Sequence, residues 1–154
     1  ALVMAETRAY LRSYAGLETD LGALLGQINR ALAPDLDGRQ FVTLLLVRLD
    51  PRTGSCRYAG AGHVPGYLLD PTGGLGHLLE GSGPPLGLFP DQRFTGGPEI
   101  ALETGGTLIL LTDGVAETFS PDGQPFGNER LLECFRSRPD ARAPIGWRTI
   151  EWSG

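Results

Sequence analysis

The sequence predicts an α+β domain in which two N-terminal helices precede a set of short antiparallel strands. Three observations carry this prediction. Apolar residues recur at helical spacing before Pro34, strand-forming residues dominate from Phe41 onwards, and 35 of the 154 residues are glycine or proline. So many turn-forming residues are typical of short strands joined by tight turns, and they argue against a helical bundle.

The first 34 residues have the apolar spacing of two amphipathic helices. Residues 1–15 predict a helix with one apolar face, made by Val3, Thr7, Tyr10, Leu11 and Tyr14. Thr19-Asp20 offers an N-cap for a second helix, and Pro34 ends it. Its apolar positions are Leu21, Leu24, Leu25, Ile28 and Leu32. We expect the two helices to pack antiparallel and to need a sheet or a partner that their apolar faces can cover.

From residue 41 the pattern changes to strand-forming runs separated by turn signals. Residues 50–54 and 70–74 both begin with Asp-Pro and end with glycine, which is typical of tight turns. We therefore predict an antiparallel meander with strands at 41–49, 55–61, 66–69 and 75–80. Irregular backbone is expected at 81–90 and a weak strand at 93–102. Short helices are predicted at 115–119 and 128–138, and residues 139–154 show no clear pattern.

Composition and charge exclude several classes of function. The net charge is −5 and the thirteen basic residues, all arginine, are scattered, which argues against nucleic-acid binding. No apolar run reaches membrane-spanning length, and no signal peptide is visible. Cys56 and Cys134 stand singly, without metal-ligand spacing, and indicate a reducing cytoplasm. We expect a cytoplasmic protein that binds neither nucleic acid nor membrane.

An uncharged, strand-forming run ends on a candidate functional carboxylate. Residues 107–112 contain no proline and no charge, so they predict a strand buried on both faces, and Asp113-Gly114 follows. A carboxylate at the end of a buried strand is held rigidly and suits an acidic metal ligand, and Gly114 would leave room beside it. The alternative is that Asp-Gly is simply a turn. Glu117 lies one helical turn later, either at the same site or as a surface acid.

The two histidines receive different interpretations. His63, in the loop Gly62-His63-Val64-Pro65, either supports a site or bonds its own loop, whereas His77 predicts a solvent-facing strand residue. No serine or cysteine has a nucleophile-elbow setting, and without lysine there is no phosphate-binding loop of the Gly-Lys type. The triplet Gly60-Ala61-Gly62 does not open a helix, so it is not a dinucleotide motif.

Five stretches in register resemble one family. They are Phe41-Val42-Thr43, Tyr58-Ala59-Gly60-Ala61-Gly62-His63-Val64-Pro65, Pro85-Leu86-Gly87, Leu111-Thr112-Asp113-Gly114-Val115-Ala116-Glu117 and Phe126-Gly127-Asn128-Glu129-Arg130-Leu131. Together they look like the bacterial PPM-type (protein phosphatase 2C-like) serine/threonine phosphatases, in the branch of stage II sporulation protein E and the RsbU-type sigma-factor regulators. The resemblance covers roughly residues 1–136, so we expect a phosphatase domain at 1–138 and a tail at 139–154.

The resemblance implies a fold and a chemistry. It implies an α-β-β-α sandwich of two antiparallel sheets, with a binuclear Mn²⁺ or Mg²⁺ centre that activates water to attack phosphoserine or phosphothreonine. The substrate would be a phosphorylated regulatory protein such as an anti-anti-sigma factor. Asp113 matches the metal-binding aspartate of the Thr-Asp-Gly motif, which makes it both metal ligand and catalytic residue, and Gly114 matches the turn glycine. Glu117 and His63 would support the site.

The sequence also departs from the family pattern. The first metal motif and the closing Asp-Asp-x-Thr motif are absent, and Val64 stands where asparagine is usual. We therefore expect a piece of a longer gene product that carries one of about three aspartate ligands and binds metal weakly. A missing strand would uncover a sheet edge or helix face, which predicts self-association, or poor order near Ala1, testable by light scattering. Two alternatives stay open: a non-catalytic phosphatase-like domain that binds a partner, and an unrelated α+β binding module.

Overall fold

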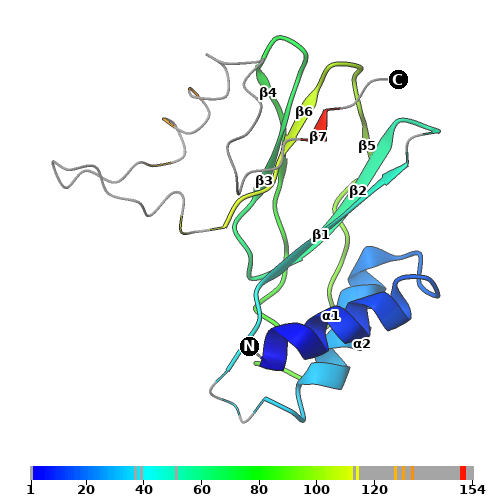
Figure 1. Ribbon diagram of the computed structural model, residues 1–154, viewed down its shortest axis with the longest axis vertical. Helices are drawn as coiled ribbons and strands as arrows, with labels where there is room; N and C mark the ends of the chain where they lie inside the picture. Colours follow the sequence, from blue (N-terminus) through cyan, green and yellow to red (C-terminus); the bar gives the residue numbers. More distant parts are fainter. Residues whose placement is uncertain are drawn as a thin grey trace, which may run out of the picture. The chain divides into compact units, whose positions relative to one another are not determined.

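The computed structural model describes residues 2–36, 38, 40–50, 52–112, 114, 127, 130, 133 and 150–151 (Figure 1). The chain divides into two compact units. The first unit comprises Ala1–His63 and Glu80–Ala101, and the second comprises Val64–Leu79 and Leu102–Gly154. Each unit contains its own antiparallel sheet.

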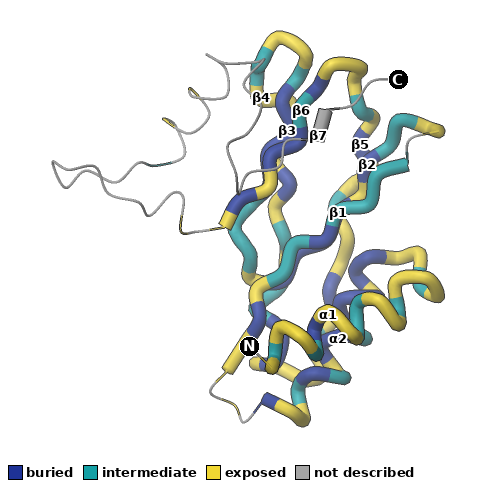
Figure 2. Tube along the Cα trace, in the orientation of Figure 1, coloured by how far each residue is buried: buried dark blue, intermediate teal, exposed yellow. Residues whose placement is uncertain are grey.

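The two predicted helices are confirmed in the first unit. Helix α1 spans Leu2–Tyr14 and helix α2 spans Leu21–Leu32. Asp20 is the N-cap of α2, because its Oδ1 accepts a hydrogen bond of 2.7 Å from the Ala23 N–H. All five predicted apolar positions of α2 are buried, whereas α1 keeps a largely exposed outer face (Figure 2). Helix α2 is therefore the inner helix of this unit.

The sheet of the first unit has the order β1-β2-β5. Strand β1 spans Leu44–Asp50, β2 spans Ser55–Ala61 and β5 spans Ile100–Ala101. Strand β1 begins three residues later than predicted, because Val42 instead forms an isolated antiparallel bridge with Leu86. The core joins α2 to one face of the β1–β2 hairpin. It includes Leu24, Leu25, Ile28 and Leu32 of α2 with Leu46 of β1 and Ala59 and Ala61 of β2.

The sheet of the second unit has the order β4-β3-β6-β7. Strand β3 spans Gly66–Leu69, β4 spans Leu75–Leu79, β6 spans Thr107–Ile109 and β7 spans Ile150–Glu151. The predicted single meander is therefore wrong: hairpins β1–β2 and β3–β4 belong to different sheets. All four strands of these hairpins form, and β2 and β3 have the predicted bounds, but alternation along a strand does not say which sheet the strand joins.

The strand predicted to be buried on both faces is real but shorter than expected. In β6, Leu108 and Ile109 are both buried, and the strand has paired neighbours, β3 and β7, on its two sides. Leu110 is 42% exposed, so burial on both faces holds only for the first part of the predicted run. Strand β7 lies within residues 139–154, where no secondary structure was predicted, because two residues are too few to show an alternation of apolar and polar side chains.

Several expectations lie outside the described residues or are only partly met. The predicted helices at 115–119 and 128–138 belong to the parts that the structure does not describe, apart from Arg130 and Glu133. Within 93–102 only Ile100–Ala101 is strand. None of the described helices combines the length and the apolar character that crossing a bilayer would need.

Candidate active site

The predicted metal ligand lies just beyond the described part of β6. Asp113 and Glu117 are outside the described residues, so their roles stay predictions. The approach to Asp113 is described: Leu111, two residues earlier, is buried with 8% of its surface exposed, and Thr112 is exposed. The chain is thus anchored in the core shortly before the predicted ligand, as a rigid site requires.

The last residues of β6 and the first residues of β3 lie side by side, at the same end of this strand pair. The two strands are antiparallel, with Tyr67 opposite Ile109 and Leu69 opposite Thr107. Residues 110–112, which lead to Asp113, therefore leave the ladder at the end where residues 64–65 enter it. Residues 64–65 and 110–112, which belong to two of the sequence motifs that carry the family resemblance, therefore flank this end of one strand pair.

Gly114 is exposed, and its φ is not in the left-handed region. Among the described residues, the nearest atom to a Cβ built on it would be the Thr112 Oγ1, at 3.9 Å. Whether a side chain at this position would crowd a group held by Asp113 stays a prediction.

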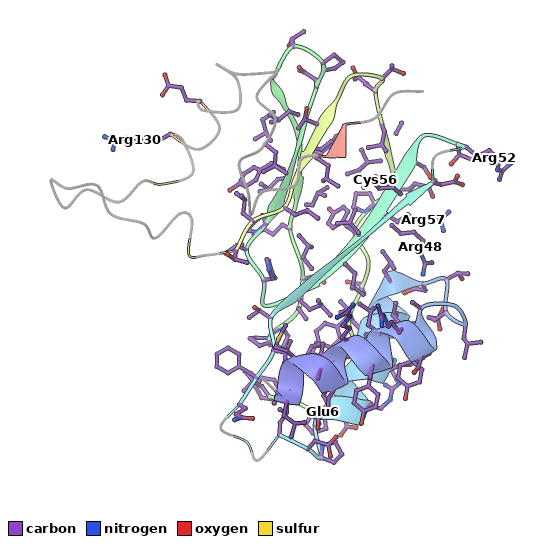
Figure 3. All side chains as sticks on the ribbon, in the orientation of Figure 1. Glu6, Arg48, Arg52, Cys56, Arg57 and Arg130 are labelled. Atoms are coloured by element: carbon purple, nitrogen blue, oxygen red, sulfur yellow. The ribbon has the colours of Figure 1, made fainter. Side chains whose placement is uncertain are left out.

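The two histidines occupy different surroundings. His63 is half-buried in the loop that follows β2, whereas His77 is exposed on β4, as the sequence predicts. Cys56, labelled in Figure 3, is completely buried in β2, and burial raises the pKa of its thiol. A buried thiol with a raised pKa is a poor nucleophile. This agrees with the exclusion of cysteine chemistry from the sequence.

The described residues do not make a metal centre by themselves. Among them there is no group of three histidine, cysteine, aspartate or glutamate side chains that could hold a metal ion. Hard divalent cations need several oxygen ligands, so the role of Asp113 as one of them stays a prediction.

Two glycine-rich segments have a role that the sequence interpretation missed. Gly60 and Gly81 approach so closely that a Cβ on Gly81 would lie 2.5 Å from the Gly60 Cα. Gly60-Ala61-Gly62 is therefore a site of close backbone packing. The signal was available in the sequence, because Gly81-Ser82-Gly83 repeats the same Gly-x-Gly spacing.

Comparison with known proteins identifies the family. The sequence profile described as "Stage II sporulation protein E (SpoIIE)" matches residues 1–145. The chain belongs to the SpoIIE family. This membership confirms the family inferred from the five motifs and excludes the unrelated α+β binding module.

Named relatives connect this SpoIIE-family chain to phosphatases. It is 34% identical to Protein IcfG of Synechocystis sp. over 109 residues, and this matched region makes up 71% of this chain and 17% of IcfG. It is 28% identical over 122 residues to the phosphoserine phosphatase RsbU of Bacillus subtilis, which covers 79% of this chain and 33% of RsbU. The chain thus spans no more than a third of these relatives. Its family is one of PP2C-type phosphatases.

A solved relative confirms the fold class. The SiaA-PP2C domain of Pseudomonas aeruginosa superposes with a TM-score of 0.75 at 26% identity, covering 94% of this chain and 57% of that domain. The SpoIIE-family chain is accordingly an α+β protein with two antiparallel sheets and N-terminal helices, as the sequence predicts. The described residues contain the helices α1 and α2, and the second helical layer implied by the resemblance stays a prediction.

Proposed function

We propose that this SpoIIE-family chain is part of a metal-dependent protein phosphatase that hydrolyses phosphoserine or phosphothreonine on a regulatory protein. The family match over residues 1–145 carries this proposal, together with a relative named as a phosphoserine phosphatase. By analogy with that branch, the substrate is a phosphorylated protein of the anti-anti-sigma type. The reaction takes place in the cytoplasm and involves neither nucleic acid nor membrane.

Asp113 is the residue on which the proposed activity depends. We assign it the role of metal ligand and catalytic carboxylate, with Gly114, Glu117 and His63 as supporting residues. Two observations support this assignment. Leu111, two residues before Asp113, is buried, and the end of β6 that leads to Asp113 is paired with the start of β3. The cation would be Mn²⁺ or Mg²⁺, because a hard divalent ion prefers oxygen ligands and offsets phosphate charge.

The test is phosphate release by the complete gene product carrying Asp113→Asn. The variant keeps the size of the side chain and removes its charge, so we expect kcat/KM on a phosphoserine protein to fall at least about 100-fold with Mn²⁺ present. Asp91→Asn is the matched control, because Asp91 is an exposed aspartate outside the proposed site, and it should leave kcat/KM unchanged. Equal activity of the Asp113→Asn variant and the wild type would refute the assignment.

The same assay separates catalysis from partner binding. A non-catalytic phosphatase-like domain would bind the phosphorylated partner in a pull-down yet release no phosphate in the presence of Mn²⁺. Wild-type protein that binds and does not hydrolyse, with Asp113→Asn binding equally well, would replace the phosphatase proposal with this second function.

A further inference from the structure

The backbone just before His63 is held by a crossing of two glycine-rich segments, residues 60–62 and 81–85, which we call the glycine brace. At its centre Gly60 and Gly81 touch without side chains between them, because a Cβ on Gly60 would lie 2.7 Å from the Gly81 Cα. Real Cβ atoms do not approach other atoms so closely, so the two chains pack at this distance only as glycines.

The brace continues up to the residue before His63. Ala61 forms a parallel bridge with Gly83, and the Gly62 N–H donates a hydrogen bond of 2.7 Å to the Gly83 carbonyl oxygen. Gly62 has φ +61°, in the left-handed region that favours glycine. Its α-carbon faces the Pro85 ring, since a Cβ there would lie 2.5 Å from the Pro85 Cγ. Hydrogen bonding and steric contact both fix the backbone direction at Gly62.

Pro85 is itself held on both sides. On one side Gly83 bridges Ala61, and on the other Leu86 exchanges two hydrogen bonds with Val42, at 3.0 and 2.8 Å. Leu86 is completely buried in the core of the first unit. The proline ring therefore lies close to Gly62 on backbone that is hydrogen-bonded on both sides, and His63 is the next residue after Gly62.

We infer that the glycine brace, through the Pro85 ring, is a positioning element of the proposed phosphatase site that fixes the backbone from which His63 projects. This inference rests on the proposed function and goes beyond it, because it assigns a role to Pro85 and to the glycines at 60, 62 and 81.

The test is a double-mutant cycle on the complete gene product with Pro85→Ala and His63→Ala. Pro85→Ala removes the ring that faces Gly62, adds no heavy atom and adds only a backbone N–H, so we expect the fold to be retained. We expect kcat to fall about tenfold with KM unchanged, because the site is loosened while substrate binding is kept. If Pro85 acts through His63, the double variant should be no slower than His63→Ala alone. Pro98→Ala and His77→Ala, both at exposed positions, are the matched controls and should leave kcat unchanged.

Amide hydrogen exchange gives a readout that is independent of activity. Pro85→Ala should speed exchange at Gly62, His63 and Val64 and leave α2 unchanged. Unchanged exchange at these three amides, or independent effects of the two substitutions on kcat, would overturn the inference. Failure of the proposed function looks different: the wild type would release no phosphate with Mn²⁺, while the exchange experiment would still decide whether the brace fixes this segment.

Discussion

A single buried amide secures the loop that follows the glycine brace. Asn29 lies on the apolar face of α2 with none of its surface exposed. Its Nδ2 donates to the carbonyl oxygens of Phe89 and Pro90, at 2.8 and 3.1 Å, and its Oδ1 accepts from the Gly87 N–H at 2.8 Å. One side chain thus satisfies three backbone groups of a loop that has no regular structure of its own.

Replacing this amide should be costly. Asn29→Ala removes the partner of the buried Gly87 N–H and of the Pro90 carbonyl, whereas the Phe89 carbonyl still accepts from the Gln92 N–H. We expect the free energy of unfolding to fall by about 2–3 kcal/mol. Gln27→Ala is the matched control in the same helix, because Gln27 makes one side-chain bond of 3.2 Å to Glu18 and should lose less than about 1 kcal/mol. Urea denaturation measures both losses, and equal losses would show that the three bonds of Asn29 add nothing.

At the scale of elements, one arginine joins strand β1 to the connection between the helices. The Arg48 guanidinium donates to the carbonyl oxygens of Thr19, Glu18 and Ala15, at 2.7, 3.0 and 3.4 Å. These carbonyls lie where α1 ends, so a cation there also favours the helix dipole. Arg57 lies directly opposite Arg48 on β2, and both residues are labelled in Figure 3. Arg57 pairs instead with Glu99, at 2.8 Å. Separate partners for the two arginines offset the repulsion expected of facing like charges.

The Arg48 guanidinium is planar and donates several hydrogen bonds at once, so its replacement by lysine should lower the stability. Arg48→Lys keeps the charge but cannot reach three carbonyls at once, so we expect a loss of about 1 kcal/mol in unfolding free energy. Amide exchange in residues 15–19 should also become faster. Arg57→Lys, at an exposed ion pair, is the control and should change stability by less than about 0.5 kcal/mol. Lysine at position 48 without effect on exchange would mean that charge alone holds this connection.

The elements also show which sequence signals predict structure reliably. Helix α2 was predicted residue by residue, because Asp20 supplies the cap and five apolar residues share one face. The start of β1 was not predicted correctly. Phe41 and Val42 have strand-forming side chains, but Val42 pairs with Leu86 outside the sheet. Propensity describes the residue, whereas the partner across the ladder decides the strand.

For the whole molecule, sequence reasoning located the family and the candidate ligand but not the support around the site. The assignment of the two hairpins to different sheets was not predicted, because alternation along a strand does not say which sheet the strand joins. The glycine brace depends on contact between segments about twenty residues apart, which strand and turn patterns do not report. Asp113 was singled out because a charge at the end of an apolar run is conspicuous in sequence, and its role stays a prediction.

Metal binding tests the molecule as a whole. A lone carboxylate binds a hard dication weakly, and at one tenth of the Kd a ligand stabilises a protein by less than about 0.1 kcal/mol. We therefore expect about 0.1 mM Mn²⁺ to leave the Tm of the 154-residue chain unchanged. The complete gene product should show a Tm that rises with Mn²⁺, falls back when EDTA removes the metal and no longer rises in Asp113→Asn. An equal rise in the 154-residue chain would mean that its own residues supply the remaining ligands.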